Sequence, residues 1–158
     1  MKIAIISDTH GYVQGCIDAL NKIEGIDIII HLGDYTKDVK AIREAFNITV
    51  LNVKGNCDSY DFETPDDNII EIKGKKIFAT HGDLYRVKQG LNDIYYRAKE
   101  LDVDVALFGH SHTSTLVEYD GVLFLNPGSP TLPRAGTSKS IGILYIDDNE
   151  VKGEIITI

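Results

Sequence analysis

The sequence predicts an α/β sandwich of mixed β-sheets flanked by helices, folded as one domain over residues 1–158. Three observations carry this prediction. The length fits one domain with a sizeable core. Short apolar runs alternate with amphipathic helical patterns in the first third of the chain, which is typical of βαβ units. The remaining part contains three hairpin signals, which add antiparallel strands.

The first 53 residues alternate strands with helices. Apolar runs of strand length cover residues 2–7, 26–31 and 48–53. Between them, apolar residues at helical spacing predict helices over residues 13–23 and 37–46. Because the strand runs are apolar on both faces, we expect a parallel sheet covered by helices.

The second half changes character, and we expect its strands to be mostly antiparallel. An amphipathic stretch predicts a helix over residues 87–101, and the apolar run over residues 103–109 predicts a further strand. The hairpins are expected over residues 68–81 with a turn at Lys73-Gly74, over residues 114–128 with a turn at Asp120-Gly121, and over residues 140–158 with a turn within residues 147–150.

Metal-binding residue types follow the ends of five predicted strands. In open α/β sheets the carboxyl ends of the strands form the ligand crevice, so these side chains should meet at one edge. Side chains at i and i+2 of an extended chain point the same way. The pair His110 and His112 should therefore aim at one small volume, as should Asp8 and His10. The strand-end residues are Asp8, His10, His31, Asp34, Asn56, Asp58, His81, His110 and His112.

Carboxylate, imidazole and amide groups together suit borderline divalent ions such as Mn, Fe, Co, Ni or Zn. The number of these residues exceeds one tetrahedral site, which indicates two ions. Two ions roughly 3.5–4 Å apart would hold both oxygens of an in-line displacement at phosphorus. A carboxylate is needed between them, and Asp34 is the natural bridge.

The same residues form a series of motifs that resembles the calcineurin-like metallophosphoesterases. The family pattern is D-x-H, G-D, G-N-[HC]-[DE], H-G and G-H-x-H, and all five blocks occur here in that order. One block would be weak evidence, whereas five in register are highly specific. The short chain and the segment NPGSPTLPR resemble the small single-domain prokaryotic phosphodiesterases of that family. The blocks are Asp8-Thr9-His10, Gly33-Asp34, Gly55-Asn56-Cys57-Asp58, His81-Gly82 and Gly109-His110-Ser111-His112.

The resemblance implies the calcineurin-like sandwich fold and a dinuclear metal-dependent phosphodiesterase. In such an enzyme a hydroxide that bridges both ions attacks phosphorus, because two cations lower the pKa of the bound water. We expect two divalent ions per chain, with Mn²⁺ or Ni²⁺ first and Fe, Co or Zn as alternatives. By the resemblance, Asp34 bridges the ions, Asp8, His10 and His112 hold one of them, and Asn56, His81 and His110 hold the other.

The chain departs from the fuller family pattern at Cys57, where many phosphomonoesterases of the family have histidine. A thiol with a reference pKa of about 8.5 cannot supply an imidazolium near neutrality. We therefore expect diesters with good leaving groups as substrates rather than monoesters. A nucleophilic role for Cys57 is the alternative, and it is disfavoured because a metal-bound hydroxide already fills that role.

Several residues near the blocks have two interpretations each. Asp58 is either an Asx-type turn residue or a residue that orients its neighbours. Arg134 is either a solvated loop residue or, with Cys57, a candidate substrate contact, since guanidinium suits phosphate geometry. We expect His31 to be satisfied by backbone groups, with support of the ligands as the alternative. Tyr35 either lines the pocket or packs within its loop.

Composition limits the partners and the location. The net charge of -8 repels nucleic-acid backbones, so we expect no stable nucleic-acid binding. No stretch is long enough to span a bilayer, and the opening apolar run stops at Ser7, which is too short for a secretory signal. Two cysteines make no disulfide framework. These features predict a cytoplasmic protein that acts on a small phosphodiester, with a homo-oligomer left open.

Two other functional classes are weighed against the diesterase. One is a phosphomonoesterase or nucleotidase. The other is a non-catalytic metal-binding scaffold of the same fold, for which a retromer subunit is the precedent in the family. All seven ligand positions are filled here, which favours an enzyme. The sequence leaves the physiological substrate, the native metal and the activity on monoesters open.

Overall fold

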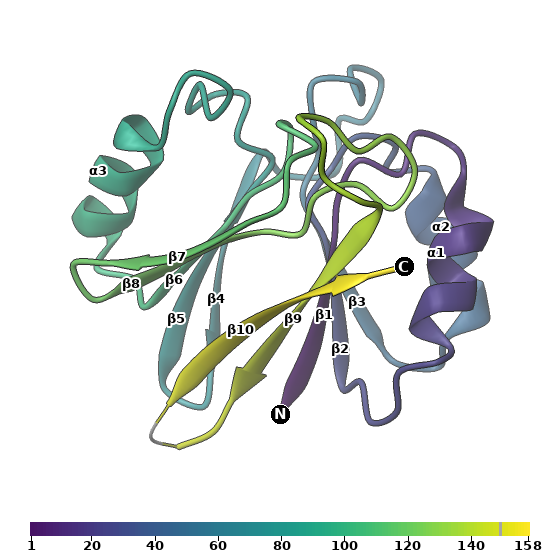
Figure 1. The fold of residues 1–158 in the computed structure, drawn as a ribbon, viewed down its shortest axis with the longest axis horizontal. Coiled ribbons are helices and arrows are strands. Elements are labelled where there is room, and N and C mark those ends of the chain that lie inside the picture. The colour runs from purple at the N-terminus through teal and green to yellow at the C-terminus, as the bar shows by residue number, and fades with distance from the viewer. Residues whose placement is uncertain (149) are drawn as a thin grey trace.

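The computed structural model describes residues 1–148 and 150–158, and it has two five-stranded sheets packed face to face with helices outside them (Figure 1). The predicted α/β sandwich of mixed sheets flanked by helices is confirmed. The elements of the first half are β1 (Lys2–Ile6), α1 (Val13–Leu20), β2 (Ile28–His31), α2 (Asp38–Ala45) and β3 (Thr49–Asn52). The second half adds β4 (Asp67–Ile72), β5 (Lys75–Thr80), α3 (Asn92–Leu101), β6 (Val105–Leu107), β7 (Thr115–Tyr119), β8 (Val122–Asn126), β9 (Ser140–Ile146) and β10 (Val151–Thr157).

The first sheet has the strand order β10-β9-β1-β2-β3. Strands β1, β2 and β3 are parallel, with Ile5 opposite Ile30. The final hairpin joins this sheet through the antiparallel pair of β1 and β9, so both ends of the chain belong to one sheet (Figure 1). The hairpin predicted over residues 140–158 is therefore confirmed, although its turn includes residue 149, which lies outside the described residues.

The two faces of the first sheet are covered differently. Helices α1 and α2 pack on one face, where Ala4 and Ile6 lie in the same hydrophobic cluster as Leu20 of α1. The other face carries Ile3 and Ile5, which pack against strands of the second sheet. The prediction of a helix-covered sheet is thus right for one face and wrong for the other. A helix layer and a second sheet both bury the strands they cover, so a continuous apolar run in the sequence does not show which of the two covers a given face.

The second sheet has the strand order β4-β5-β6-β8-β7 and is covered by α3 on its outer face. Both predicted hairpin turns are confirmed, and antiparallel pairs form at β4–β5 and β7–β8. The expectation of mostly antiparallel strands needs a correction, because β5, β6 and β8 are parallel to one another. The predicted helix over residues 87–101 begins only at Asn92, because hydrogen-bonded turns precede it and Gly90 has φ 148°.

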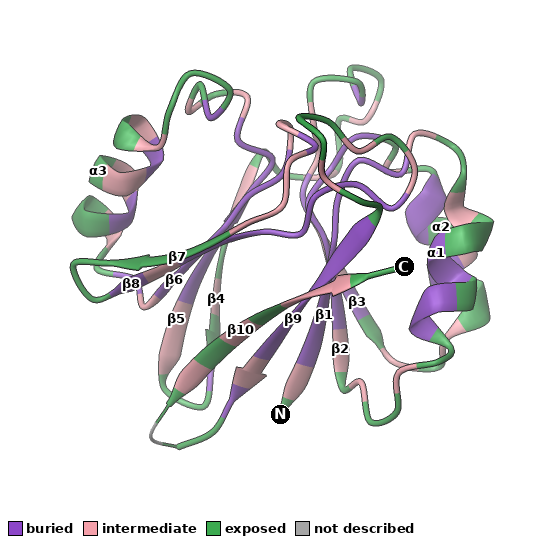
Figure 2. Cartoon of the chain, in the orientation of Figure 1, coloured by how far each residue is buried: buried purple, intermediate pink, exposed green. Residues whose placement is uncertain are grey.

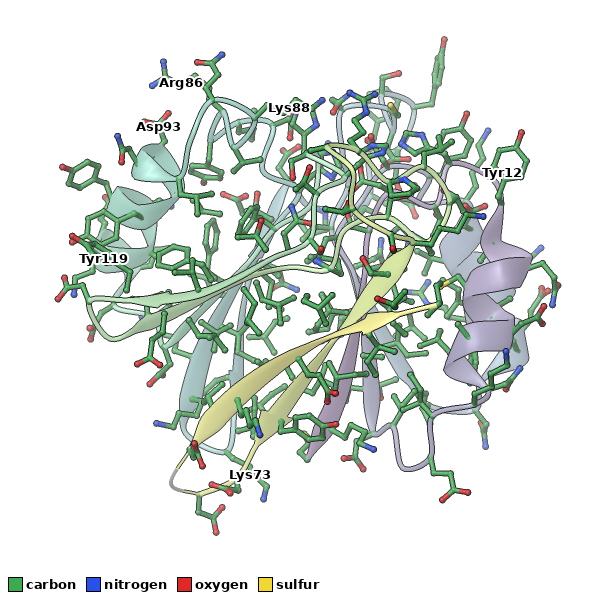
Figure 3. All side chains as sticks on the ribbon, in the orientation of Figure 1. Tyr12, Lys73, Arg86, Lys88, Asp93 and Tyr119 are labelled. Atoms are coloured by element: carbon green, nitrogen blue, oxygen red, sulfur yellow. The ribbon has the colours of Figure 1, made fainter. Side chains whose placement is uncertain are left out.

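The loops that follow β1, β2, β3, β5 and β6 all lie at one end of the sandwich, at the top of Figure 1. The β4–β5 turn at Lys73 lies at the opposite end (Figure 3). Between the two ends, β1 and β9 are buried along most of their length (Figure 2). Within residues 1–148 and 150–158, no helix is long and apolar enough to cross a membrane.

Truncation of Ile77 should cost far more stability than truncation of Ile69, although both isoleucines lie in the β4–β5 hairpin. Ile77 is fully buried between the sheets, whereas Ile69 is 47% exposed. We expect Ile77→Ala to lower the free energy of unfolding by about 2–5 kcal/mol. The matched Ile69→Ala should cost about 1 kcal/mol or less. Urea unfolding measures both, and equal losses would contradict the assignment of the core between the sheets.

Candidate metal centre

Six of the seven predicted ligands lie together at the loop end of the sandwich. They come from the loops after β1, β2, β5 and β6. This agrees with the prediction that residues just beyond the strand ends meet at one edge. They form two groups whose ligand atoms lie within 4.8 Å of one another. Asp34 belongs to both groups, which is the position that a bridging carboxylate needs. One group is Asp8, His10, Asp34 and His112, and the other is Asp34, His81 and His110.

Within each group, the imidazole nitrogens and carboxylate oxygens lie close to one another. In the first group, His112 Nε2 lies 3.1 Å from Asp8 Oδ1, and His10 Nε2 lies 3.7 Å from Asp34 Oδ2. In the second group, His81 Nε2 lies 3.4 Å from Asp34 Oδ1. His110 Nδ1 lies 3.2 Å from the same His81 nitrogen. His110 and His112 therefore belong to neighbouring groups, as the resemblance implies.

Backbone carbonyls fix which ring nitrogens face inward. His81 Nδ1 lies 2.8 Å from the carbonyl oxygen of Leu32, and His112 Nδ1 lies 2.7 Å from that of Leu132. A carbonyl only accepts, so each Nδ1 carries the proton and donates it. In the neutral rings, both Nε2 lone pairs then point at carboxylate oxygens, and such an arrangement needs a positive charge between the two atoms.

Asp8 provides an independent test of whether the cluster fits a cation. Its Oδ1 atom is buried and accepts no hydrogen bond from the described residues. Its Oδ2 atom accepts the backbone N–H of His110 at 3.0 Å. A buried carboxylate oxygen without a partner is costly unless an ion coordinates it. Together with the inward Nε2 atoms, this orphaned oxygen makes a donor set that fits divalent metal.

The pKa values of the cluster show the same demand for positive charge. Burial would raise the pKa values of Asp8 and Asp34, but the neighbouring imidazoles of His112 and His81 outweigh it and hold both pKa values low. Burial would lower the pKa of His81, yet Asp34 and Asp8 raise it. Protons on these imidazoles thus offset the two buried carboxylates, and a bound cation would take the place of those protons.

Five of the seven predicted ligands have left-handed backbone conformations, which non-glycine residues seldom adopt. Asp8, His10, Asp34, His110 and His112 have φ between 49° and 63°. The expectation that the pairs at i and i+2 lie on extended chain is therefore wrong, although both pairs do reach the cluster. Each such residue costs on the order of 1–3 kcal/mol and persists only because its surroundings enforce it, and strain of this kind gathers at functional sites.

The loop after β3 brings Asn56 and Cys57 to the edge of the cluster. Gly55 lies so close that a Cβ atom on it would come 2.3 Å from Asp34 Oδ1. The backbone N–H of Cys57 donates to the same oxygen at 2.9 Å. Asn56 is exposed, and its Nδ2 lies 3.5 Å from Cys57 Sγ. Its position beside Asp34 agrees with the predicted ligand role, which stays a prediction.

Asp58 has hydrogen-bond partners both in its own loop and in a neighbouring loop. Its Oδ2 accepts the N–H of Gly55 at 2.9 Å, which closes a turn within its own loop. Its Oδ1 accepts the N–H groups of Tyr35 and Thr36 at 2.9 and 2.8 Å. One buried carboxylate therefore joins the loop after β2 to the loop after β3 and positions Asp34 beside Asn56.

The segment over residues 126–134 contains supporting residues that the sequence analysis did not identify. The Ser129 hydroxyl donates to the carbonyl of Asp8 at 2.8 Å, and Asn126 Nδ2 donates to that of Gly109 at 2.7 Å. A Cβ atom on Gly109 would come 1.9 Å from Ser7 Oγ, so only glycine fits there. The signal in the sequence is the polar NPGS stretch at the end of a predicted buried strand.

Arg134 ends the same segment and lies at the rim of the cluster. Its backbone N–H donates to the carbonyl of His112 at 3.1 Å, and its side chain is exposed. The neighbouring carboxylate of Asp8 raises the pKa of His112, and the charge of Arg134 opposes that rise. The guanidinium is therefore near enough to act on the centre, and its contact with substrate stays a prediction.

The fold and the cluster together define an α/β sandwich protein with an imidazole–carboxylate site for divalent metal. The chain belongs to the calcineurin-like phosphoesterase superfamily, whose domain profile matches residues 1–149. The family is one of metal-dependent phosphoester hydrolases, so both the predicted resemblance and the predicted fold are confirmed.

Two relatives and one solved structure illustrate the similarity. The chain is 38% identical over 151 residues to the probable metallophosphoesterase YsnB of Bacillus subtilis, which covers 94% of this chain and 86% of that protein. It is 30% identical over 175 residues to the phosphodiesterase MJ0936 of Methanocaldococcus jannaschii. This match covers 96% of this chain and 97% of that protein. The crystal structure of Vps29 from Entamoeba histolytica in complex with zinc matches with a TM-score of 0.79 and 26% identity. This match covers 99% of this chain and 98% of the Vps29 chain.

His31 lies at the end of β2 and is completely buried behind the cluster. Its Nδ1 accepts the N–H of Gly33 at 3.2 Å, so Nε2 carries the proton toward the Thr9 hydroxyl at 3.1 Å. The expected backbone partner is present, and the bond to Thr9 also ties the loop after β1 to the loop after β2. Burial lowers the pKa of His31 to about 4, from an ordinary value of 6.5.

This shift predicts a pH dependence of stability that depends on His31. Between pH 6.5 and about 4 the unfolded chain binds a proton at His31 that the folded protein does not. The stabilisation is therefore complete above pH 6.5 and is lost as the pH falls, by roughly 3 kcal/mol in total. Urea unfolding of the metal-free protein should show a weaker pH dependence in His31→Asn over this window. Parallel curves for the two proteins would contradict a neutral, buried His31.

Proposed function

We propose that this protein is a dinuclear metal-dependent phosphodiesterase that acts on a small phosphodiester. The observation that carries the proposal is the shared position of Asp34, whose two carboxylate oxygens face His10 in one group and His81 in the other. A carboxylate between two ligand groups supports two adjacent ions. The phosphodiesterase name of a relative 30% identical over nearly the whole chain agrees with this activity.

The proposed ligands divide between two ions. Asp8, His10 and His112 would hold one ion, Asn56, His81 and His110 the other, and Asp34 both. The mixture of imidazole, carboxylate and amide favours Mn²⁺ or Ni²⁺, with Fe, Co and Zn as alternatives. When bound, two such ions supply Lewis acidity, which polarises the phosphoryl group and makes water nucleophilic near neutral pH.

The protein contributes orientation and fixed dipoles. The carbonyls of Leu32 and Leu132 hold the imidazoles of His81 and His112 in one tautomer. The backbone N–H groups of Cys57 and His110 hold one oxygen of each buried carboxylate. Groups held in this way need little rearrangement during the reaction, which lowers the barrier. Arg134 at the rim is proposed to bind a non-bridging phosphate oxygen.

The state of Cys57 supports diesters over monoesters. Burial raises the pKa of its thiol to about 11, and the neighbouring carboxylate of Asp34 adds to the rise. A thiol with this pKa is neutral near pH 7, so it is neither a thiolate nucleophile nor a cationic partner for a leaving oxygen. A doubly charged monoester would therefore lack the help that a histidine gives at this position.

We propose one domain over residues 1–158 and a cytoplasmic location, which agrees with the free thiols of Cys16 and Cys57. A formal charge of -8 supports a small substrate rather than stable nucleic-acid binding. The oligomeric state is left open.

A screen of bis(4-nitrophenyl) phosphate and 4-nitrophenyl phosphate with each candidate metal tests the function directly. We expect metal analysis to give two ions per chain and the diester to be the better substrate. Chelation should abolish turnover and leave the far-ultraviolet circular dichroism largely intact, because three hydrophobic clusters build the core. A metal-loaded protein without diester turnover would contradict the proposal and favour the non-catalytic scaffold.

Asp34→Asn should lower turnover by about 100-fold or more and reduce the bound metal below two ions per chain, because an amide cannot neutralise two cations. Steady-state kinetics and metal analysis measure both effects. Asp93→Asn on α3 is the matched control, since Asp93 pairs with Arg86 and belongs to neither ligand group (Figure 3). Two retained ions and a nearly normal rate in Asp34→Asn would refute the bridging assignment.

Cys57→His should raise monoester hydrolysis relative to diester hydrolysis. Help of this kind at a leaving oxygen is worth about 10²–10⁴-fold at correct geometry, so a simple replacement should give a modest shift in the ratio. Cys57→Ser should keep most of the diesterase activity, because no thiol nucleophile is needed. Loss of diester turnover in Cys57→Ser with both metals bound would instead favour a nucleophilic cysteine.

A further inference from the structure

A cavity of about 670 Å³ opens directly beside the candidate metal centre. One wall is the loop after β2, with Tyr35, Thr36 and Lys37. The other wall is the loop between β3 and β4, which stands above the end of the first sheet (Figure 1). Its volume is that of a pocket for a small organic group. None of the roles proposed above for the metal centre uses it.

Shared residues connect this pocket to the centre. Tyr35 directly follows Asp34, and its ring centroid lies 5.4 Å from that of His10. Cys57 lines the pocket, and its N–H donates to Asp34. A ligand with its phosphate at the centre would therefore place one ester substituent in the pocket without crossing another segment of the chain.

The pocket is lined by aromatic rings that take little part in the core. The side chains of Tyr60 and Phe62 are 88% and 86% exposed, and that of Tyr35 is 39% exposed. Their loop is nevertheless fixed, because Asp61 Oδ1 accepts the N–H groups of Glu63 and Thr64 at 3.1 and 2.9 Å. Exposed aromatic rings on an anchored loop provide a stacking surface at little cost in conformational freedom.

The charges of the pocket restrict what it binds. Among the described lining residues Lys37 is the only cation, whereas Asp58, Asp61 and Glu63 are acidic. A second phosphate or another anionic group would be repelled by these carboxylates. An uncharged planar ring stacks on aromatic side chains without this penalty.

We propose that the pocket binds the nucleobase of a nucleotide-type phosphodiester whose phosphate lies at the metal centre. The inference rests on the proposed function and deepens it, since it names the chemical class of one ester substituent. Tyr60 and Phe62 are the stacking residues, and Tyr35 joins the pocket to the centre. Because base stacking is tolerant of sequence, the pocket favours nucleosides over sugars more than one base over another.

Binding of two phosphate probes to the Mn²⁺-loaded protein tests this inference. Adenosine 5′-monophosphate and ribose 5-phosphate share the phosphate and the sugar and differ by the base. Isothermal titration calorimetry should give a dissociation constant roughly tenfold lower for the nucleotide. In the double variant Tyr60→Ala/Phe62→Ala, the ratio of the two constants should fall toward one.

The control variant is Tyr119→Ala, which removes an exposed aromatic ring at the far side of the molecule (Figure 3). It should keep the wild-type ratio, and circular dichroism verifies that both variants fold. Equal constants in the wild type, undetectable nucleotide binding, or an unchanged ratio in the double variant would overturn the inference. A protein that prefers the nucleotide but hydrolyses no diester would support the nucleobase pocket and contradict the proposed function. A protein that hydrolyses diesters but binds both probes equally would contradict the pocket and leave the proposed function intact.

Discussion

The burial of two carboxylates, Asp8 and Asp34, is the constraint on which the loop end of the molecule depends. Charged groups are rarely buried without partners, because the loss of hydration costs several kcal/mol per ion. Here, backbone N–H groups of Cys57 and His110 satisfy one oxygen of each. The imidazoles around them supply protons, and in the proposed enzyme cations held by these imidazoles take the place of those protons. The chain meets both requirements, backbone donors and surrounding imidazoles, by bringing five loops together at one end.

The sandwich architecture makes that convergence feasible. Strands β1 to β3 are parallel, and so are β5 and β6, so that both sheets direct their carboxyl ends to the same end of the molecule. Each sheet contributes ligands to both groups, with Asp34 from the first sheet shared between them. The hydrophobic cluster between the sheets therefore sets the distance between the ligands. Damage to this core would loosen the centre without touching a ligand.

The loops at this end have little conformational freedom. The Asp58 carboxylate accepts a hydrogen bond from the N–H of Tyr35, directly after Asp34, while Ser129 and Asn126 donate to the carbonyls of Asp8 and Gly109. The bonds of Asp58, together with those of Asp61, also anchor the loop that carries the exposed aromatic rings of the pocket. A rigid centre next to a rigid pocket is an arrangement that binds the phosphate and a substituent of one ligand together, which is the basis of both proposals.

The sequence by itself determined the elements and their order, because apolar periodicity and turns such as Lys73-Gly74 and Asp120-Gly121 are local properties. It also predicted that Asp8, Asp34, His81 and the two later histidines would meet, since each follows a strand. Only the tertiary structure decided that a second sheet covers the inner face of the first, and that β5, β6 and β8 are parallel. It alone decided the left-handed backbone of the ligands and the support from Ser129 and Asn126, because these depend on contacts between segments far apart in the chain.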